Sequence, residues 1–187
     1  MASAFSHAVV ALSIGTVFYK AHVPKRVWVA GAICSALPDL DSMGFDFGIH
    51  YGDFWGHRGF THSICFAALL AAVILLVVGK APPLSRAKVW LFLFLATASH
   101  GVLDAMTNGG LGVAFFSPFN NYRYFLPWRP VMVAPISIRR FFSVSGLEVM
   151  GSELLWLWIP AILFGAAVWW FRRRRLLPET STAQPAS

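Results

Sequence analysis

Seven acidic and imidazole side chains of this sequence stand in short groups whose spacing suits a metal ion. His100 and Asp104 lie four positions apart in an apolar segment, and side chains at i and i+4 share one face of a helix. Asp39 and Asp41 flank a single leucine, and carboxylates that close repel each other unless a cation lies between them. The candidate metal ligands are His7, Asp39, Asp41, His57, His62, His100 and Asp104.

Each group has a simpler explanation when it is taken alone. His100 and Asp104 could form a hydrogen-bonded pair inside a membrane, Asp39 and Asp41 a solvated turn, and His7 an interfacial histidine. Taken together, these groups favour a functional site over separate structural roles, because ionisable groups in or near membrane spans are costly. Seven ligands exceed the four of a tetrahedral zinc site, and they suit two ions about 3.5–4 Å apart that share a carboxylate or water. We expect two divalent ions, with zinc preferred and manganese or iron as alternatives.

The composition indicates an integral membrane protein. Of the 187 residues, 57% are hydrophobic and only 12% are charged, whereas a soluble domain is about 25% charged. This composition excludes a disordered chain and argues against an ordinary soluble enzyme. Two cysteines exclude a thiolate-rich metal cage and a disulfide scaffold. The 15 basic residues outnumber the 8 acidic ones, but they lie between apolar segments, as in membrane proteins, so we expect lipid partners and no nucleic acid.

The apolar segments predict an all-α integral membrane protein with about five membrane helices. The first two segments are short and form a helical hairpin at the N-terminus. A long irregular loop over Thr107 to Gly151, re-entrant or lying on the surface and helical near Ile136 to Phe142, precedes the last span, and Pro38 to Gly59 forms another irregular loop. The five helices are expected at about Ser6 to Tyr19, Val27 to Leu37, Thr61 to Gly79, Val89 to Met106 and Leu154 to Phe171.

Alternating passes through the bilayer should gather the candidate ligands. Because successive spans run in opposite directions, all seven ligands, up to 97 positions apart, fall at one membrane face, whereas ten of the fifteen Lys and Arg residues fall at the other. Basic residues in short loops mark the cytoplasmic side. We therefore expect residues 1–171 to form one membrane-embedded metal-site domain that opens to the external or periplasmic side, and residues 172–187 to form a basic, then disordered, cytoplasmic tail.

The motifs around these ligands resemble a known family. His7, Leu-Pro-Asp-Leu-Asp at 37–41, His-Arg-Gly-Phe-Thr-His-Ser at 57–63 and Ser-His-Gly-Val-Leu-Asp-Ala-Met-Thr at 99–107 resemble the YdjM-like family of prokaryotic inner-membrane proteins. The resemblance covers roughly the first 130 residues. It implies an inner (plasma) membrane location and metal-dependent hydrolysis. The His-x-x-x-Asp spacing is also similar to that of the zinc phospholipase C class, whose zinc cluster cleaves phosphoesters.

These features favour a membrane-embedded metal-dependent hydrolase of phosphoesters that uses a metal-activated water. Its expected substrate is a lipid headgroup or a lipid-linked phosphate. Arg58 is the candidate phosphate clamp, since a guanidinium matches phosphate with two hydrogen bonds; a structural pairing with an aspartate is the alternative. Asn108 is expected to orient a ligand or donate to the substrate. A non-enzymatic protein that binds or transports divalent ions or protons is the second hypothesis, and a scaffold without turnover is the third.

Overall fold

The computed structural model describes residues 1–135, 142 and 144–174, and the regular secondary structure of these residues is helical. No strand occurs within these residues, where β-structure is limited to two isolated bridges that pair Thr107 with Val131 and Val113 with Tyr124. The predicted all-α class is therefore confirmed. The tail from residue 175 and most of the helix expected near 136–142 lie outside the described residues.

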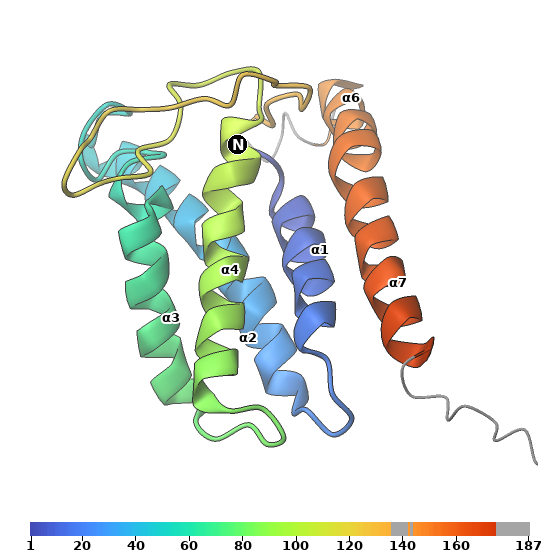
Figure 1. The fold of residues 1–187 in the computed structure, drawn as a ribbon. Helices are drawn as coiled ribbons and strands as arrows, with labels where there is room; N and C mark the ends of the chain where they lie inside the picture. The colour runs from blue at the N-terminus through green and yellow to red at the C-terminus, as the bar shows by residue number, and fades with distance from the viewer. Residues whose placement is uncertain (136–141, 143, 175–187) are drawn as a thin grey trace, which may run out of the picture.

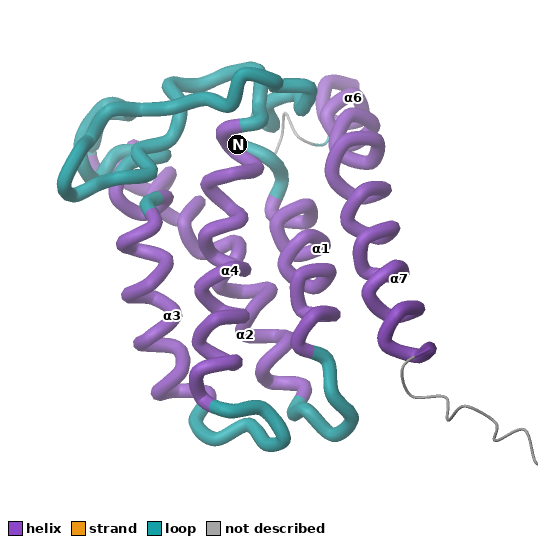
Figure 2. The backbone as a smooth tube through the Cα atoms, viewed as in Figure 1, coloured by secondary structure: helices purple, strands orange, loops and turns teal. Residues whose placement is uncertain are grey.

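Four helices pack side by side as a bundle whose chain direction alternates (Figure 1). The N-terminus and the long loops lie at one end, and the two short turns lie at the other (Figure 2). The chain therefore returns to the same end after every second helix, as the expected crossing pattern requires. The four helices are α1 (Ala4–Gly15, extended by the 3-10 turn η1, Thr16–Phe18), α2 (Lys25–Ala36), α3 (Ile64–Val78) and α4 (Arg86–Ala105).

Local sequence signals set where these helices begin and how closely they pack. The hydroxyls of Ser3, Ser63 and Ser85 accept hydrogen bonds from backbone N–H groups in the first turns of α1, α3 and α4, which satisfies donors that lack partners inside the helix. Between the helices, Phe92 is fully buried and lies against Gly31, where an added Cβ would overlap the aromatic ring. The glycine thus lets α2 approach α4.

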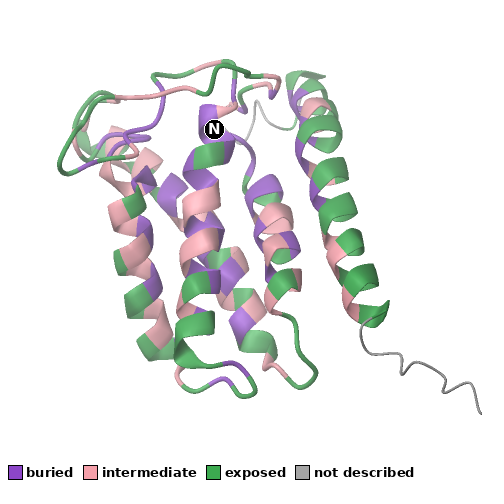
Figure 3. Ribbon diagram, viewed as in Figure 1, coloured by how far each residue is buried: buried purple, intermediate pink, exposed green. Residues whose placement is uncertain are grey.

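A longer helix follows the bundle and packs along α1 (Figure 1). It consists of α6 (Val144–Glu153), a π-helical turn η4 (Leu154–Trp158) and α7 (Ile159–Arg174). With 31 residues, it is the one helix within the described ranges that is both long and apolar enough to cross a membrane, whereas the apolar helices Ala4–Phe18 and Ile64–Val78 are shorter. Many of its side chains are exposed (Figure 3). Five membrane helices are thus not established by length and composition.

Two expected irregular segments contain more helix than the sequence suggested. Residues Leu37–Phe47 form a long 3-10 helix, η2, that begins with Pro38 in its first turn and ends at Gly48, whose φ is 77°. The proline suits a helix start because its φ is already fixed near the helical value. The last helix begins at Val144 rather than near Leu154. The polar residues that obscured this boundary include Ser152, whose hydroxyl accepts from the N–H of Met132. The connection before it is correspondingly shorter than expected.

The close approach of Gly31 to Phe92 generates a stability prediction. Gly31→Ala should lower the midpoint of thermal unfolding in detergent, because overpacking costs about 1–3 kcal/mol and outweighs a helix-propensity gain of about 1 kcal/mol. Gly151→Ala, in helix α6, is the matched control, since an added Cβ at Gly151 meets no atom within 4 Å. This variant should leave the unfolding midpoint unchanged or raise it. Equal midpoints for the two variants would contradict the packing argument.

Candidate metal centre

Side chains from four parts of the chain converge at the loop-bearing end of the bundle. His7 lies in the first turns of α1, Asp39 and Asp41 lie on η2 after α2, and His57 precedes the 3-10 turn η3 (Phe60–His62). His62 ends that turn, and α4 contributes His100 and Asp104 near its C-terminal end. Their side chains are almost completely excluded from solvent. The seven residues singled out in the sequence therefore occupy one buried cluster.

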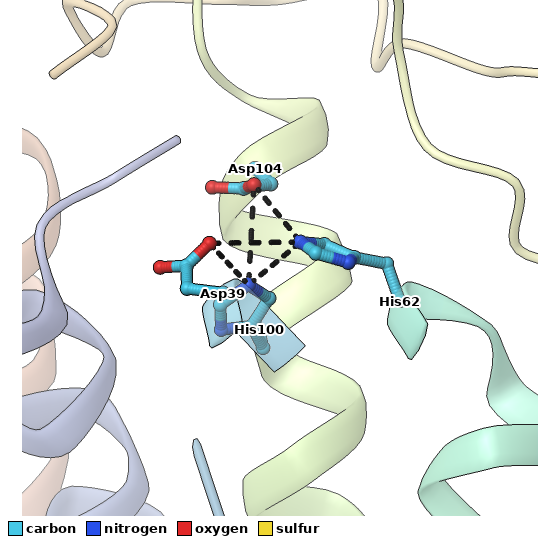
Figure 4. Close-up of side chains that lie close together, drawn as sticks. All are labelled: Asp39, His62, His100 and Asp104. Carbon is cyan, nitrogen blue, oxygen red and sulfur yellow. Dashed lines mark hydrogen bonds and ion pairs between the residues drawn. The ribbon is translucent and has the colours of Figure 1, made fainter. Parts of the chain in front are cut away.

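Four of these side chains present one atom each to a common point (Figure 4). Nε2 of His62 lies 3.0 Å from Nε2 of His100. Oδ1 of Asp39 lies 3.4 Å from the His100 nitrogen and 3.7 Å from the His62 nitrogen, and Oδ2 of Asp104 lies 3.9 Å and 3.5 Å from the same two atoms. Atoms that bind one ion at about 2.0–2.2 Å lie roughly 3–4 Å from each other. This donor set could hold a metal ion.

The tautomers of the two histidines support a cation between them. Nδ1 of His100 lies 2.7 Å from the carbonyl oxygen of Ser35. Nδ1 of His62 lies 3.2 Å from Oδ2 of Asp41 and 3.1 Å from the Thr61 hydroxyl, which donates its own hydrogen to that carboxylate. Both Nδ1 atoms therefore face acceptors and carry the hydrogen, so both Nε2 lone pairs face each other. Two lone pairs at that separation repel unless a metal ion or a proton lies between them. Metal-binding histidines commonly donate their other N–H in this way.

His7 lies near the second oxygen of each of these carboxylates. Its Nε2 lies 3.9 Å from Oδ2 of Asp39 and 3.7 Å from Oδ1 of Asp104, and its ring stacks on that of His100. Both nitrogens of His7 and both oxygens of Asp39 are buried without a hydrogen-bond partner. Each such atom costs about 1–3 kcal/mol. The distances show that Asp39 and Asp104 each turn one oxygen toward the His62–His100 pair and the other toward His7.

Asp41 collects hydrogen bonds from the segment that carries His57 and His62. Its Oδ1 lies 2.7 Å from Nδ1 of His57, and its Oδ2 accepts from the Thr61 hydroxyl and from the Arg58 N–H. Burial raises the pKa of Asp41, but its hydrogen bonds to the two histidines outweigh burial and lower that pKa to about 2. Asp41, His57 and His62 also form a group close enough to hold an ion, and Nε2 of His57 is buried without a partner.

The guanidinium of Arg58 is fully buried and bonded within the protein. Its Nε donates to Oδ2 of Asp104 at 3.0 Å, its NH1 to the Gly109 carbonyl and its NH2 to the Thr107 hydroxyl. Arg58 also has a positive φ of 63°, a conformation that non-glycine residues rarely adopt. The sequence left two roles open for Arg58, a phosphate clamp or a structural partner of an aspartate. Its contacts match the second role, because its guanidinium places a positive charge beside Asp104.

Asn108 is exposed and ties two backbone segments together. Its side-chain oxygen accepts from the N–H of Val133 at 3.0 Å, and its own N–H donates to the Val131 carbonyl. These contacts hold the 131–133 segment against the end of α4. Nothing in them turns the amide toward the cluster.

Sequence reasoning did not assign a role to Glu153, a further buried carboxylate near the cluster. It accepts hydrogen bonds from the Ser3 N–H and from the hydroxyls of Ser3 and Ser6, and it is fully buried. The adjoining Ala2 N–H donates to Oδ1 of Asp104 at 2.7 Å. Glu153 thus anchors the segment that carries His7. An acidic residue at the start of an apolar span was the available signal.

Comparison with known proteins shows the family of this chain. A family model described as "YdjM inner membrane protein" matches residues 1–175. The chain belongs to this family. Within the YdjM family, the inner membrane protein YbcI of Escherichia coli (strain K12) is 38% identical over 173 residues, which cover 92% of this chain and 100% of the relative. No solved structure matches the chain. Membership of the YdjM family supports an inner-membrane location and extends over the last helix, beyond the region covered by the motif resemblance.

The unpartnered oxygens of Asp39 generate the first prediction about metal. Asp39→Asn removes a charged donor without leaving any protein hydrogen bond unmade, because neither oxygen has such a partner. We expect the metal content of the purified protein, measured by plasma mass spectrometry, to fall more than about tenfold, since even residues that only support metal ligands change affinity by about 10–100-fold. Asp46→Asn, on the exposed part of the same 3-10 helix, is the control. Equal metal content in the two variants would rule out Asp39 as a ligand.

Asp41 should behave differently because its oxygens accept from protein donors. Asp41→Asn should weaken metal affinity by about 10–100-fold, the effect of disturbing a group that orients ligands, while saturating metal restores full occupancy. Titration with a competing chelator measures this difference. A stoichiometry that falls and stays low at saturating metal would show instead that Asp41 binds an ion directly.

Proposed function

We propose that this protein is a membrane-embedded metal-dependent hydrolase of phosphoesters. The observation that carries the proposal is the arrangement of Asp39 and Asp104, each of which turns one oxygen toward His7 and the other toward the pair of His62 and His100. This arrangement supports two divalent ions bridged by carboxylates. Bound there, such ions would lower the pKa of a water molecule and neutralise charge that develops on a phosphoryl group.

The surrounding residues set the charge, orientation and tautomer of the metal-binding side chains. Arg58 offsets the negative charge of Asp104 and fixes the orientation of its carboxylate through the bond to Oδ2. Asp41 fixes the tautomer of His62 and orients His57. The second nitrogen of His57 is left as a buried lone pair, available to a ligand of the site. In this proposal, Arg58 acts on Asp104 rather than on the substrate, and Asn108 acts on the loop that covers the site.

The proposed membrane arrangement follows from the bundle and its charges. Residues 1–171 form one membrane-embedded domain whose five helices cross the bilayer, the shorter ones with help from their flanking turns. The end opposite the cluster carries the basic turns that contain Lys20, Lys25 and Lys80, together with the C-terminal end of α7 (Figure 1). Because basic residues near short loops favour the cytoplasm, that end is assigned to the cytoplasm and the metal centre to the external or periplasmic side.

A lipidic substrate suits the surface of the site-bearing end. Large aromatic side chains on its loops are exposed, with Tyr122 at 67%, Trp128 at 57% and Trp55 at 56%. Exposed Trp and Tyr rings are typical of the bilayer interface. A lipid headgroup or a lipid-linked phosphate would reach the centre from this interface.

The burial of the donors favours one alternative, a protein that binds or transports divalent ions or protons without turnover. His7, His100 and Asp104 are fully buried, and the facing lone pairs of His62 and His100 would accept a proton as well as a metal ion. Transport, however, needs polar groups along a path. The bundle interior beyond the cluster is formed by apolar residues, among them Phe92, Leu93 and Ala96.

Hydrolysis is tested with the purified protein after metal removal and reloading with zinc or manganese. We expect chelator-sensitive cleavage of bis(p-nitrophenyl) phosphate and of phospholipids in mixed micelles. Asp39→Asn should lower that activity by more than about a hundredfold, beyond the 10–100-fold typical of supporting residues, and Asp46→Asn should not. Metal-loaded protein that cleaves no phosphoester but carries the ion or protons across liposomes would overturn the proposal in favour of transport.

A further inference from the structure

A cavity lies at the end of the molecule opposite the metal centre. It opens between the turn that follows α1 and the last turns of α7, and its volume is about 750 Å³. Among the lining residues that the structure describes, three are cationic, two are aromatic and none is acidic. The lining residues are Thr16, Tyr19, Lys20, Ala21, Trp169, Arg172 and Arg173.

One of the three cationic side chains is bonded within the protein, and the other two are exposed and available to an anionic ligand. Arg172 donates from NH1 to the carbonyl oxygens of Thr16 and Val17, which fixes α7 against the end of η1. Lys20 and Arg173 are exposed, and Arg173 lies over the ring of Trp169 at 5.3 Å from its centroid. The cavity thus presents two solvent-accessible positive charges on a wall that Arg172 holds in place.

The remaining walls of the cavity suit an amphipathic ligand. Tyr19 and Trp169 are 58% and 55% exposed, and such rings commonly lie at the level of lipid headgroups. A second cavity of about 290 Å³, lined by Val17, Val168, Phe171 and Arg172, shares Arg172 with the first. An apolar hollow therefore adjoins a cationic one at the end of the helix long enough to span the membrane.

We propose that these two cavities bind an anionic phospholipid. Lys20 and Arg173 hold its phosphate, Tyr19 and Trp169 contact its glycerol region, and the apolar hollow takes the start of an acyl chain. A free phosphate would use only the charges and leave the aromatic and aliphatic walls exposed. A zwitterionic lipid would bring its own cation against Lys20 and Arg173. The site is separate from the metal centre and does not depend on hydrolysis.

The experiment measures lipid retained by the full-length protein in micelles that contain equal amounts of phosphatidylglycerol and phosphatidylcholine, read by native mass spectrometry. We expect phosphatidylglycerol to be enriched at least about fivefold over phosphatidylcholine, the effect of roughly one favourable basic contact. The double variant Lys20→Gln, Arg173→Gln should abolish the enrichment. Both side chains are exposed, so the thermal midpoint in lipid-free detergent should match that of the parent protein.

The matched control removes two charges from the same end of the molecule. Lys80 and Lys88 are exposed and lie outside both cavities, and Lys80→Gln, Lys88→Gln should keep the enrichment. Equal loss in the two double variants would mean that diffuse surface charge attracts the lipid and would overturn the proposal. Displacement of phosphatidylglycerol by millimolar inorganic phosphate would overturn it as well, because the ligand would then be the free anion.

Discussion

The structure at the loop-bearing end depends on how buried negative charge is balanced. Asp39 and Asp104 lie within one cluster with three imidazoles and almost no solvent. Within the described part of the chain, only Asp104 has an arginine beside it, and Asp39 has no hydrogen bond to either oxygen. Burying ionised groups is costly unless they are paired or bind metal. The facing lone pairs of His62 and His100 impose the same requirement, which a metal ion or a proton between them would meet.

The rest of the fold supplies what such a cation needs. The alternating helices bring together residues from both halves of the sequence, and tight packing at Gly31 sets the approach of α2 to α4. The segment before α3 is held by Asp41 and by the side chain of Arg123, which donates to the carbonyls of His57 and Tyr51. Glu153 holds the start of α1 from the last helix. Donors from separate elements are thereby fixed before any ligand arrives.

Much of this arrangement could be predicted from the sequence, because it follows from long-range regularities. Apolar segments of helical length predict successive helices that run in opposite directions, and this alternation places His7 and His100 at the same end of the bundle. The roles within the cluster could not be predicted, since they depend on contacts between irregular segments. Asp39 and Asp41 differ by two positions, yet one has unpartnered oxygens and the other accepts from its neighbours. Likewise, no pattern distinguished an Arg58 facing substrate from one bonded to Asp104, and the start of the last helix at Val144 was hidden by its polar residues.

Anomalous X-ray scattering from crystals or lipidic mesophases of the zinc-loaded protein tests the central claim most directly. The account predicts a zinc peak within bonding distance of Nε2 of His62 and Nε2 of His100, with carboxylate oxygens of Asp39 and Asp104 completing its surroundings. A zinc-saturated crystal with no peak at that point, and with the two imidazoles joined by a direct hydrogen bond, would contradict it.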